Sequence, residues 1–238
     1  MRALTGQDEI AFHAPAGGAH GRLAALAAAV GGRGIEALSA LTLPEWEGAL
    51  LALRRALIGP HIESETDCTG CGAGNALAFS LDDLPREPAA PLPLDGVPLR
   101  LLRLGDLIAL ERRGLRGEAA LAALLSLAAG MEPAQAEARL AGPDRETVIA
   151  ALESAVAGLG LEIGTACTDC GTALVLPLDV AEFLDTELRS RAATLLDEIH
   201  LIAMSYHWSE TEILALPVSR RQDYLRRILA ARTLAEEP

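Results

Sequence analysis

The chain has 238 residues, of which 50% are hydrophobic and only 3% aromatic, and its formal net charge is −13. This length allows one large or two small domains, and a core of Leu, Ala, Val and Ile is typical of packed helices. The acidic charge makes nucleic acid an unlikely partner, because binding to phosphates requires a basic face. We find no membrane span, since no uncharged stretch is long enough, and no secretory signal, so we expect a cytoplasmic protein.

The first predicted elements are two short strands, at residues 3–4 and 10–12, followed by a helix over residues 21–30. The next helix is expected to begin near Thr42. Thr42 and Glu45 fit a capping box, in which each side chain bonds to the backbone N–H of the other residue.

A β-hairpin with a Cys-x-x-Cys-Gly sequence at its turn is predicted next. Cys68 and Cys71 lie in this turn, one strand leads into it, and residues 76–79 lead out. The glycine after the second cysteine permits the positive φ that such a tight turn requires. Residues 85–98 contain five prolines, and we expect them to form an extended linker.

The chain then repeats itself. Cys68 falls on Cys167 at an offset of 99 residues, and Arg2 falls on Arg100 at an offset one residue shorter. We predict a first copy at residues 1–84, the linker at 85–98, a second copy at 99–178 and a C-terminal module at 179–238. In the second copy we expect strands at residues 99–104 and 107–110, helices over 117–129 and from 144, and an outgoing hairpin strand at 173–178.

The C-terminal module is predicted to be helical. Apolar residues recur at three- and four-residue steps over residues 180–206, which indicates one long amphipathic helix. Ser209 and Glu212 fit a capping box for a second, short helix, and Ser219 and Gln222 fit another for a third helix.

The only cysteines of the chain form two Cys-x-x-Cys pairs, Cys68 with Cys71 and Cys167 with Cys170. This is the ligand set of a tetrahedral Cys₄ zinc site. Each copy would supply half of the site, so that one structural Zn²⁺ holds the copies in a pseudo-two-fold arrangement. Four thiolates leave no open position on zinc, which favours a structural site over a catalytic one. The alternatives are a redox-active pair, which usually opens a helix whereas a strand follows here, and reduced thiols in a core.

The remaining candidates indicate a surface for a partner. Arg220, Arg221 and Tyr224, with Tyr206 and Trp208 before them, are candidate partner-binding residues, because aromatic residues and Arg dominate binding hot spots. The alternatives are a solvated helix face and a Trp208 that only packs the final helices together. The five histidines follow no ligand spacing, and no catalytic motif is found. We therefore expect no enzyme and no small-molecule substrate.

Residues 198–228 carry a distinctive pattern, His-Leu-x-Ala-x-x-Tyr-x-Trp-Ser-Glu-x-Glu-Ile-Leu-x-Leu-x-x-x-Arg-Arg-x-x-Tyr-Leu, from His200 to Leu225. It resembles proteins encoded beside contractile phage tails and phage-tail-like contractile injection systems, similar to the T4-type baseplate and hub-assembly group. The cysteine turns and residues 4–10 also resemble that family, although Thr69 and Thr168 stand where its turns carry Pro. The resemblance implies a structural or assembly role among other baseplate or tail proteins, and no enzymatic activity.

Taken together, these patterns predict a mainly helical α+β fold: an internally duplicated unit whose two β-hairpins share one Cys₄ zinc site, followed by a helical C-terminal module. The predicted function is a non-enzymatic structural or assembly component of the baseplate of a contractile phage tail-like particle. We expect it in the cytoplasm or in the assembled particle. The alternatives are a cytoplasmic zinc-ribbon adaptor that binds protein or nucleic acid, and a thiol oxidoreductase.

Overall fold

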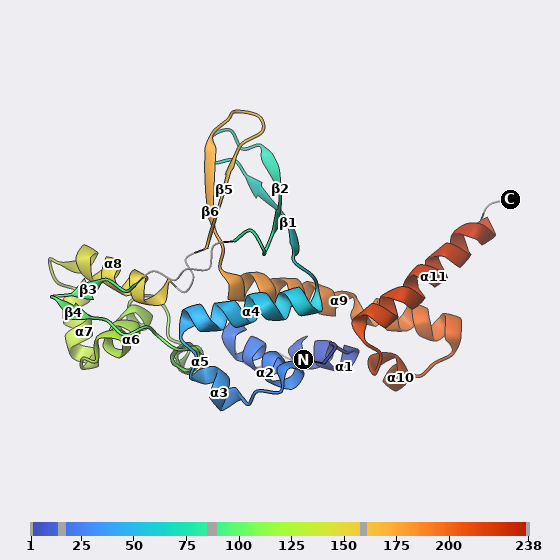
Figure 1. The fold of residues 1–238 in the computed structure, drawn as a ribbon, viewed down its shortest axis with the longest axis horizontal. Coiled ribbons are helices and arrows are strands. Elements are labelled where there is room, and N and C mark those ends of the chain that lie inside the picture. Colours follow the sequence, from blue (N-terminus) through green and yellow to red (C-terminus); the bar gives the residue numbers. More distant parts are fainter. Residues whose placement is uncertain (1, 14–17, 85–89, 158–160, 237–238) are drawn as a thin grey trace. The chain divides into compact units, whose positions relative to one another are not determined.

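The structure is a computed structural model that describes residues 2–13, 18–84, 90–157 and 161–236. Helices dominate, and the strands of these segments form three two-stranded antiparallel hairpins (Figure 1). The prediction of a mainly helical α+β fold with two cysteine-bearing hairpins and a helical C-terminal region is confirmed.

The chain divides into two compact units, which we describe separately. Unit 1 comprises Met1–Gly34 together with Leu184–Pro238, and unit 2 comprises Ile35–Phe183. These units do not follow the boundaries drawn from the repeat, so those domain boundaries stay a prediction.

Unit 2 holds most of the secondary structure. Its helices are α3 (Ile35–Ser39), α4 (Leu43–Leu57), α5 (Leu104–Arg113), α6 (Gly117–Ala129), α7 (Pro133–Leu140) and α8 (Arg145–Val156). Its strands are β1 (His61–Asp67), β2 (Gly74–Ser80), β3 (Pro93–Leu94), β4 (Val97–Pro98), β5 (Glu162–Ala166) and β6 (Ala173–Pro177). The capping box predicted for α4 is present, with the backbone N–H of Thr42 donating to the Glu45 carboxylate at 2.8 Å.

Helices α6, α7 and α8 pack around one apolar core, which also receives a residue of the linker. Leu94 of β3 is buried in this core. The described part of the linker is therefore not simply extended. Asp95 and Gly96 take positive φ angles of 53° and 77° between β3 and β4, as a tight hairpin turn requires. Residues 85–89 of the predicted linker lie outside the described residues. The other core residues include Leu99, Leu102, Ala122, Leu125, Ala136, Leu140, Val148 and Leu152.

Unit 1 is helical in its described segments. It contains α1 (Gly6–His13), α2 (Ala19–Gly31), α10 (Glu210–Leu214) and α11 (Val218–Glu236), and most of α9 (Val180–Tyr206), which begins in unit 2. The predicted cap of α10 is confirmed, because Ser209 Oγ accepts the backbone N–H of Glu212. Helix α11 already begins at Val218, so the capping box predicted at Ser219 is wrong. One core cluster of this unit joins α9, α10 and α11 through Leu195, Ile199, Ile202, Ile213, Leu225 and Ile228.

The strands predicted at residues 3–4, 10–12, 99–104 and 107–110 are wrong. Residues 10–12 lie in α1 and residues 107–110 in α5, while residues 3–4 and 99–102 form neither a helix nor a strand. An acidic side chain in the first turn of each helix accepts a hydrogen bond from the backbone just before the helix. Asp8 accepts the backbone N–H of Thr5 at 2.9 Å, and Asp106 accepts that of Arg103 at 2.9 Å. A short apolar run by itself does not distinguish a strand from a buried helix.

The order of elements repeats along the chain, with four helices before each cysteine-bearing hairpin. Helices α2 and α6 have the same length, at an offset of 98 residues. The backbone N–H of Arg2 donates to Val30, and that of Arg100 donates to Ala128, both at 2.9 Å. Equivalent positions of the two copies therefore make equivalent local contacts.

Candidate metal centre

Each cysteine pair lies at the turn of its hairpin, and the backbone is the same in both turns. In the first turn the N–H of Cys68 donates to Ala73 and the N–H of Gly72 donates to Cys68, both at 2.8 Å. The second turn repeats these bonds at 2.9 and 3.0 Å. Gly72 and Gly171 have φ angles of 75° and 74°, a left-handed conformation that glycine adopts without strain.

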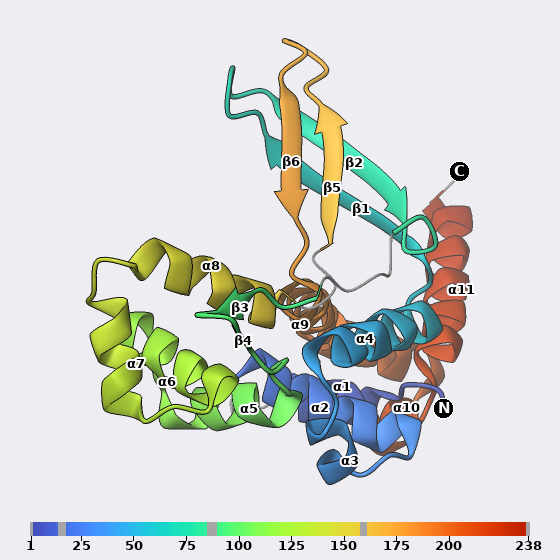
Figure 2. The same ribbon diagram turned by 60° about the vertical axis from the view of Figure 1, so that its left-hand side comes forward.

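The hairpins β1–β2 and β5–β6 lie side by side with their turns at the same end (Figure 2). All four Sγ atoms lie within 4.8 Å of one another. The Sγ–Sγ distance is 3.6 Å for Cys68–Cys170 and 3.7 Å for Cys71–Cys167. Sulfurs bound tetrahedrally at a Zn–S distance of about 2.3 Å lie ~3.8 Å apart. The cluster of the four predicted ligands is thus compatible with a structural metal ion.

Three of the thiols have shifted pKa values. The backbone N–H of Cys170 lowers the pKa of Cys167 to about 6, and Thr172 lowers the pKa of Cys170. The pKa of Cys71 shifts in the opposite direction. A bond from Ala73 lowers it, but hydrogen bonds with the other cysteines and burial together raise it to about 12. Thiolates this close repel one another, so the cluster can lose all its protons only when a cation balances the charge.

Asn75 links the two hairpins beside the cysteines, and sequence reasoning missed it. This residue is 3% exposed, and its Nδ2 donates to the Ala73 carbonyl at 2.8 Å and to Cys167 Sγ at 3.7 Å. Its Oδ1 accepts the backbone N–H of Thr168 from the other hairpin at 2.9 Å. The only signal in the sequence is that the second copy carries Leu174 at this position.

Away from the cysteines, a pocket lined by both hairpins and by Glu182 and Phe183 of α9 lies beside the strands. This hollow has a volume of about 310 Å³. Its apolar lining includes Ile62, Leu77, Phe79, Ile163 and Leu176. A metal at the cysteine end would therefore link the turns of the two hairpins. The pseudo-two-fold relation of the whole copies stays a prediction.

The aromatic candidates lie together in unit 1. The ring centroids of Tyr206 and Trp208 are 5.2 Å apart and stacked, and Tyr224 meets both edge-on at 5.3 and 4.9 Å. All three residues are partly exposed, and Arg220 is exposed. Between the rings, His207 is exposed and has a φ of 58°, which is uncommon for a residue other than glycine.

Arg221 lies elsewhere. It is 1% exposed, and its guanidinium pairs with Glu9 of α1 and, at 3.1 Å, with Glu198 of α9. This burial removes Arg221 from the expected partner-binding surface. The sequence shows two adjacent arginines, and only the packing of α11 decides which one faces inward.

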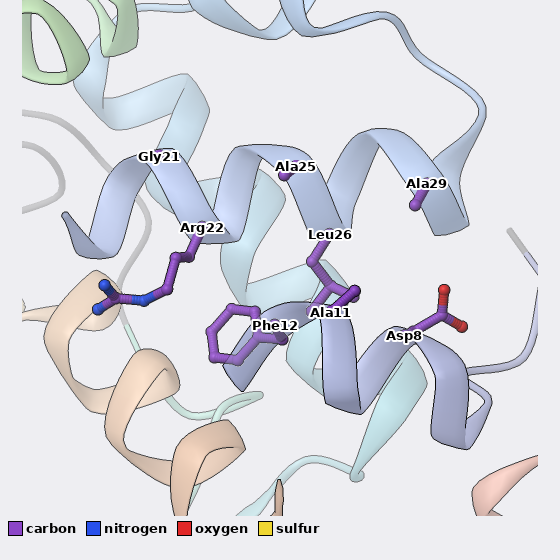
Figure 3. A pocket seen from close by; sticks show the side chains of 8 residues that line it. All are labelled: Asp8, Ala11, Phe12, Gly21, Arg22, Ala25, Leu26 and Ala29. Carbon is purple, nitrogen blue, oxygen red and sulfur yellow. The ribbon is translucent and has the colours of Figure 1, made fainter. Parts of the chain in front are cut away.

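A second hollow, of about 280 Å³, lies between α1 and α2 of unit 1 (Figure 3). Asp8 and Arg22 lie at its opposite ends. Both are paired, Asp8 with Arg2 and Arg22 with Asp185, each at 2.6 Å. The other lining residues are Ala11, Phe12, Gly21, Ala25, Leu26 and Ala29.

Comparison with protein-family models, curated proteins and solved structures finds no match. Within the described segments, no single helix is long and apolar enough to cross a membrane. Helices α6 and α7 together reach the length and apolar composition of a membrane span, but they are bent by 117° relative to each other.

Proposed function

We propose that this chain is a non-enzymatic structural or assembly component of the baseplate of a contractile phage tail-like particle, stabilised by one structural Zn²⁺. Its partners are other baseplate or tail proteins, and it acts in the cytoplasm or in the assembled particle. The four converging cysteines support the metal, and the resemblance of residues 198–228 supports the baseplate role.

Zinc is the metal that best fits four sulfur ligands at tetrahedral spacing, with no position left for substrate. Iron also binds four thiolates, but it colours the protein. We expect purified chain to be colourless and to contain about one zinc per chain. Cys68→Ser and Cys167→Ser are expected to lower the zinc content and the melting temperature equally, because each removes one ligand of the same ion. Two metals per chain, or none with four reactive thiols, would contradict the shared site.

The partner surface that we propose consists of the aromatic cluster (Tyr206, Trp208 and Tyr224) with Arg220. Partly exposed aromatic rings supply large rigid contact area, and an exposed Arg adds charge-assisted hydrogen bonds. Trp208 also packs against the α9–α11 core. A variant at Arg220 therefore tests binding with less effect on the fold.

The baseplate role is tested in a host that produces the contractile particle. Deletion of the gene is expected to give tubes and sheaths without complete baseplates by electron microscopy, and the wild-type gene restores them. Complementation with Arg220→Ala is expected to restore fewer complete particles than Arg226→Ala. The latter is the matched control, because Arg226 lies on the same helix with a side chain that is 75% exposed. Complete baseplates in the deletion strain would refute the proposal.

The second candidate function is a zinc-ribbon adaptor, which the pair of cysteine-bearing hairpins favours. The net charge of −13 disfavours the form that binds nucleic acid. Salt-dependent binding to duplex DNA, measured by fluorescence anisotropy, would support this alternative over the baseplate role.

A further inference from the structure

Helices α10 and α11 reproduce the layout of α3 and α4. Each pair consists of a five-residue helix, a three-residue connection and a long helix. Residue 35 corresponds to residue 210 and residue 43 to residue 218, a constant offset of 175. In the connection, Ala40-Leu41 corresponds to Ala215-Leu216. We call this arrangement the helix pair.

Both helix pairs bind the start of a repeat copy through the same backbone contact. In unit 2, Thr42 and Arg103 form an isolated antiparallel β-bridge, and in unit 1, Pro217 and Thr5 form the equivalent bridge. Within these bridges the N–H of Leu43 donates to Leu102, and the N–H of Val218 donates to Leu4, both at 3.0 Å. The two bonds join equivalent positions, since the donors differ by 175 residues and the acceptors by 98.

In both units the last residue of the short helix lies close to a glycine at the start of the repeat copy. A Cβ on Gly6 would lie 2.7 Å from Leu214 Cδ2, and Leu214 is the last residue of α10. A Cβ on Gly105 would lie 3.1 Å from the carbonyl oxygen of Ser39, the last residue of α3. Glycine permits the approach in both units, with Gly105 one position past the equivalent of Gly6.

The five positions that are buried in α10–α11 are also buried in α3–α4, where α4 buries Pro44, Leu51 and Arg54 in addition. Four of these positions are apolar in both pairs, and one differs in chemistry: Trp46 is 0% exposed in α4, and Arg221 is 1% exposed in α11. The repeat copies that bind the two pairs also differ between a charged and an apolar residue, because Glu9 of α1 corresponds to Leu107 of α5. The apolar correspondences are Leu38 with Ile213, Leu43 with Val218, Leu50 with Leu225 and Leu53 with Ile228.

We infer that α10–α11 is a further copy of the helix pair, and that the buried Glu9–Arg221 ion pair selects α1 as its binding site. On α5, Arg221 would meet the position of Leu107 and become a buried cation without its carboxylate. On α1, a Trp at the position of Arg221 would leave Glu9 buried without its cation. Each mismatch leaves an unpaired buried charge, which is strongly unfavourable, whereas each matched combination does not.

The surroundings of Glu9 show why the cation is needed there. Glu9 is 4% exposed, and burial raises its pKa while the charge of Arg221 opposes that rise. Glu198 also accepts a hydrogen bond from Arg221. It accepts a second hydrogen bond from Gln222, and its side chain is 15% exposed. Removing Arg221 therefore affects two carboxylates, of which Glu9 is the more deeply buried.

The test is a double-mutant cycle in the full, metal-loaded chain, with hydrogen exchange of the Val218 amide as the measure of α11 docking. Arg221→Trp is expected to increase exchange about 100-fold, and Glu9→Leu about 10-fold, because Arg221 then keeps Glu198. The double variant Glu9→Leu/Arg221→Trp is expected to return to within about tenfold of wild type, since it recreates the apolar match. Glu9→Leu/Arg221→Met supplies a smaller apolar side chain in case the indole does not fit.

The matched control is Glu9→Leu/Arg220→Trp, which places the indole on the exposed neighbour and is expected to give no recovery. The Leu43 amide, which makes the equivalent bond in unit 2, is expected to keep its wild-type rate in every variant. Single variants without effect, two double variants that exchange as fast as Arg221→Trp alone, or equal recovery in the control would each overturn the inference.

Discussion

Replacing Asn75 with Ala tests how strongly the metal centre depends on a residue that binds no metal. Asn75 makes bonds of 2.8 Å to Ala73 within its own hairpin and 2.9 Å from Thr168 in the other hairpin. It also donates to Cys167 Sγ at 3.7 Å. The variant removes all of these contacts and leaves the four cysteines in place.

The size of the effect follows from which contacts require the hairpins to be together. The bond to Ala73 is local, whereas the bonds to Thr168 and Cys167 join the hairpins. A neutral hydrogen bond contributes about 1 kcal/mol and one to a thiolate about 1.5–3 kcal/mol, so the cross-hairpin bonds together contribute ~2.5 kcal/mol or more. At about 1.4 kcal/mol per tenfold, Asn75→Ala is expected to weaken metal binding about 60-fold or more.

The assay is competition for zinc against a chromophoric chelator at fixed pH, with the melting temperature measured with and without the chelator. Thr69→Ala is the matched control, because Thr69 is the exposed counterpart of Thr168 in the first turn. A zinc affinity of Asn75→Ala within about threefold of this control would refute the view that Asn75 orients the ligands.

Two further predictions concern unit 1. A hydrogen bond from Arg2 lowers the pKa of Asp8 from 3.8 to about 2, so the carboxylate stabilises the fold above its unfolded pKa. We expect this contribution, about 1 kcal/mol after screening at the half-exposed Arg2, to be lost as the pH falls from about 4 to 2. Asp8→Asn is expected to reduce the dependence of the melting temperature on pH between about pH 4 and 2, and an unchanged dependence would contradict the assignment. Gly6→Ala would place a Cβ 3.1 Å from the Leu214 backbone and is expected to cost about 1–3 kcal/mol in urea unfolding. Gly34→Ala has open space around it and is the control; equal midpoints would refute the steric argument.

Structure that depends on neighbours within a few residues could be predicted well from the sequence. The caps at Thr42 and Ser209 and the two cysteine turns are all closed by bonds over three to five positions. The long helix α9 follows from its apolar period in the same way. The four candidate ligands could be named for the same reason, since the spacing within each pair and the repeat are both visible in the residues.

Other features depended on which faces meet in three dimensions. The apolar runs of α1 and α5 suit a strand as well as a helix, and packing, which buries Phe12 of α1 and Ile108 of α5, decides between them. Arg220 and Arg221 are neighbours of identical chemistry, and the 100° turn between successive helix positions places one in solvent and the other against Glu9. Burial of a single side chain therefore cannot be read from its own neighbours in the chain.

The similarity of α10–α11 to α3–α4 is only partly visible in the sequence. Only a few identities survive in the sequence, because the shared property is the set of buried positions and these tolerate any apolar residue of suitable size. The backbone bonds Leu43–Leu102 and Val218–Leu4 reveal the correspondence, since they record which segments lie together. The local elements of this chain are encoded residue by residue. The pairing of its distant segments, and the inward-facing charge that accompanies it, emerges only when the helices pack.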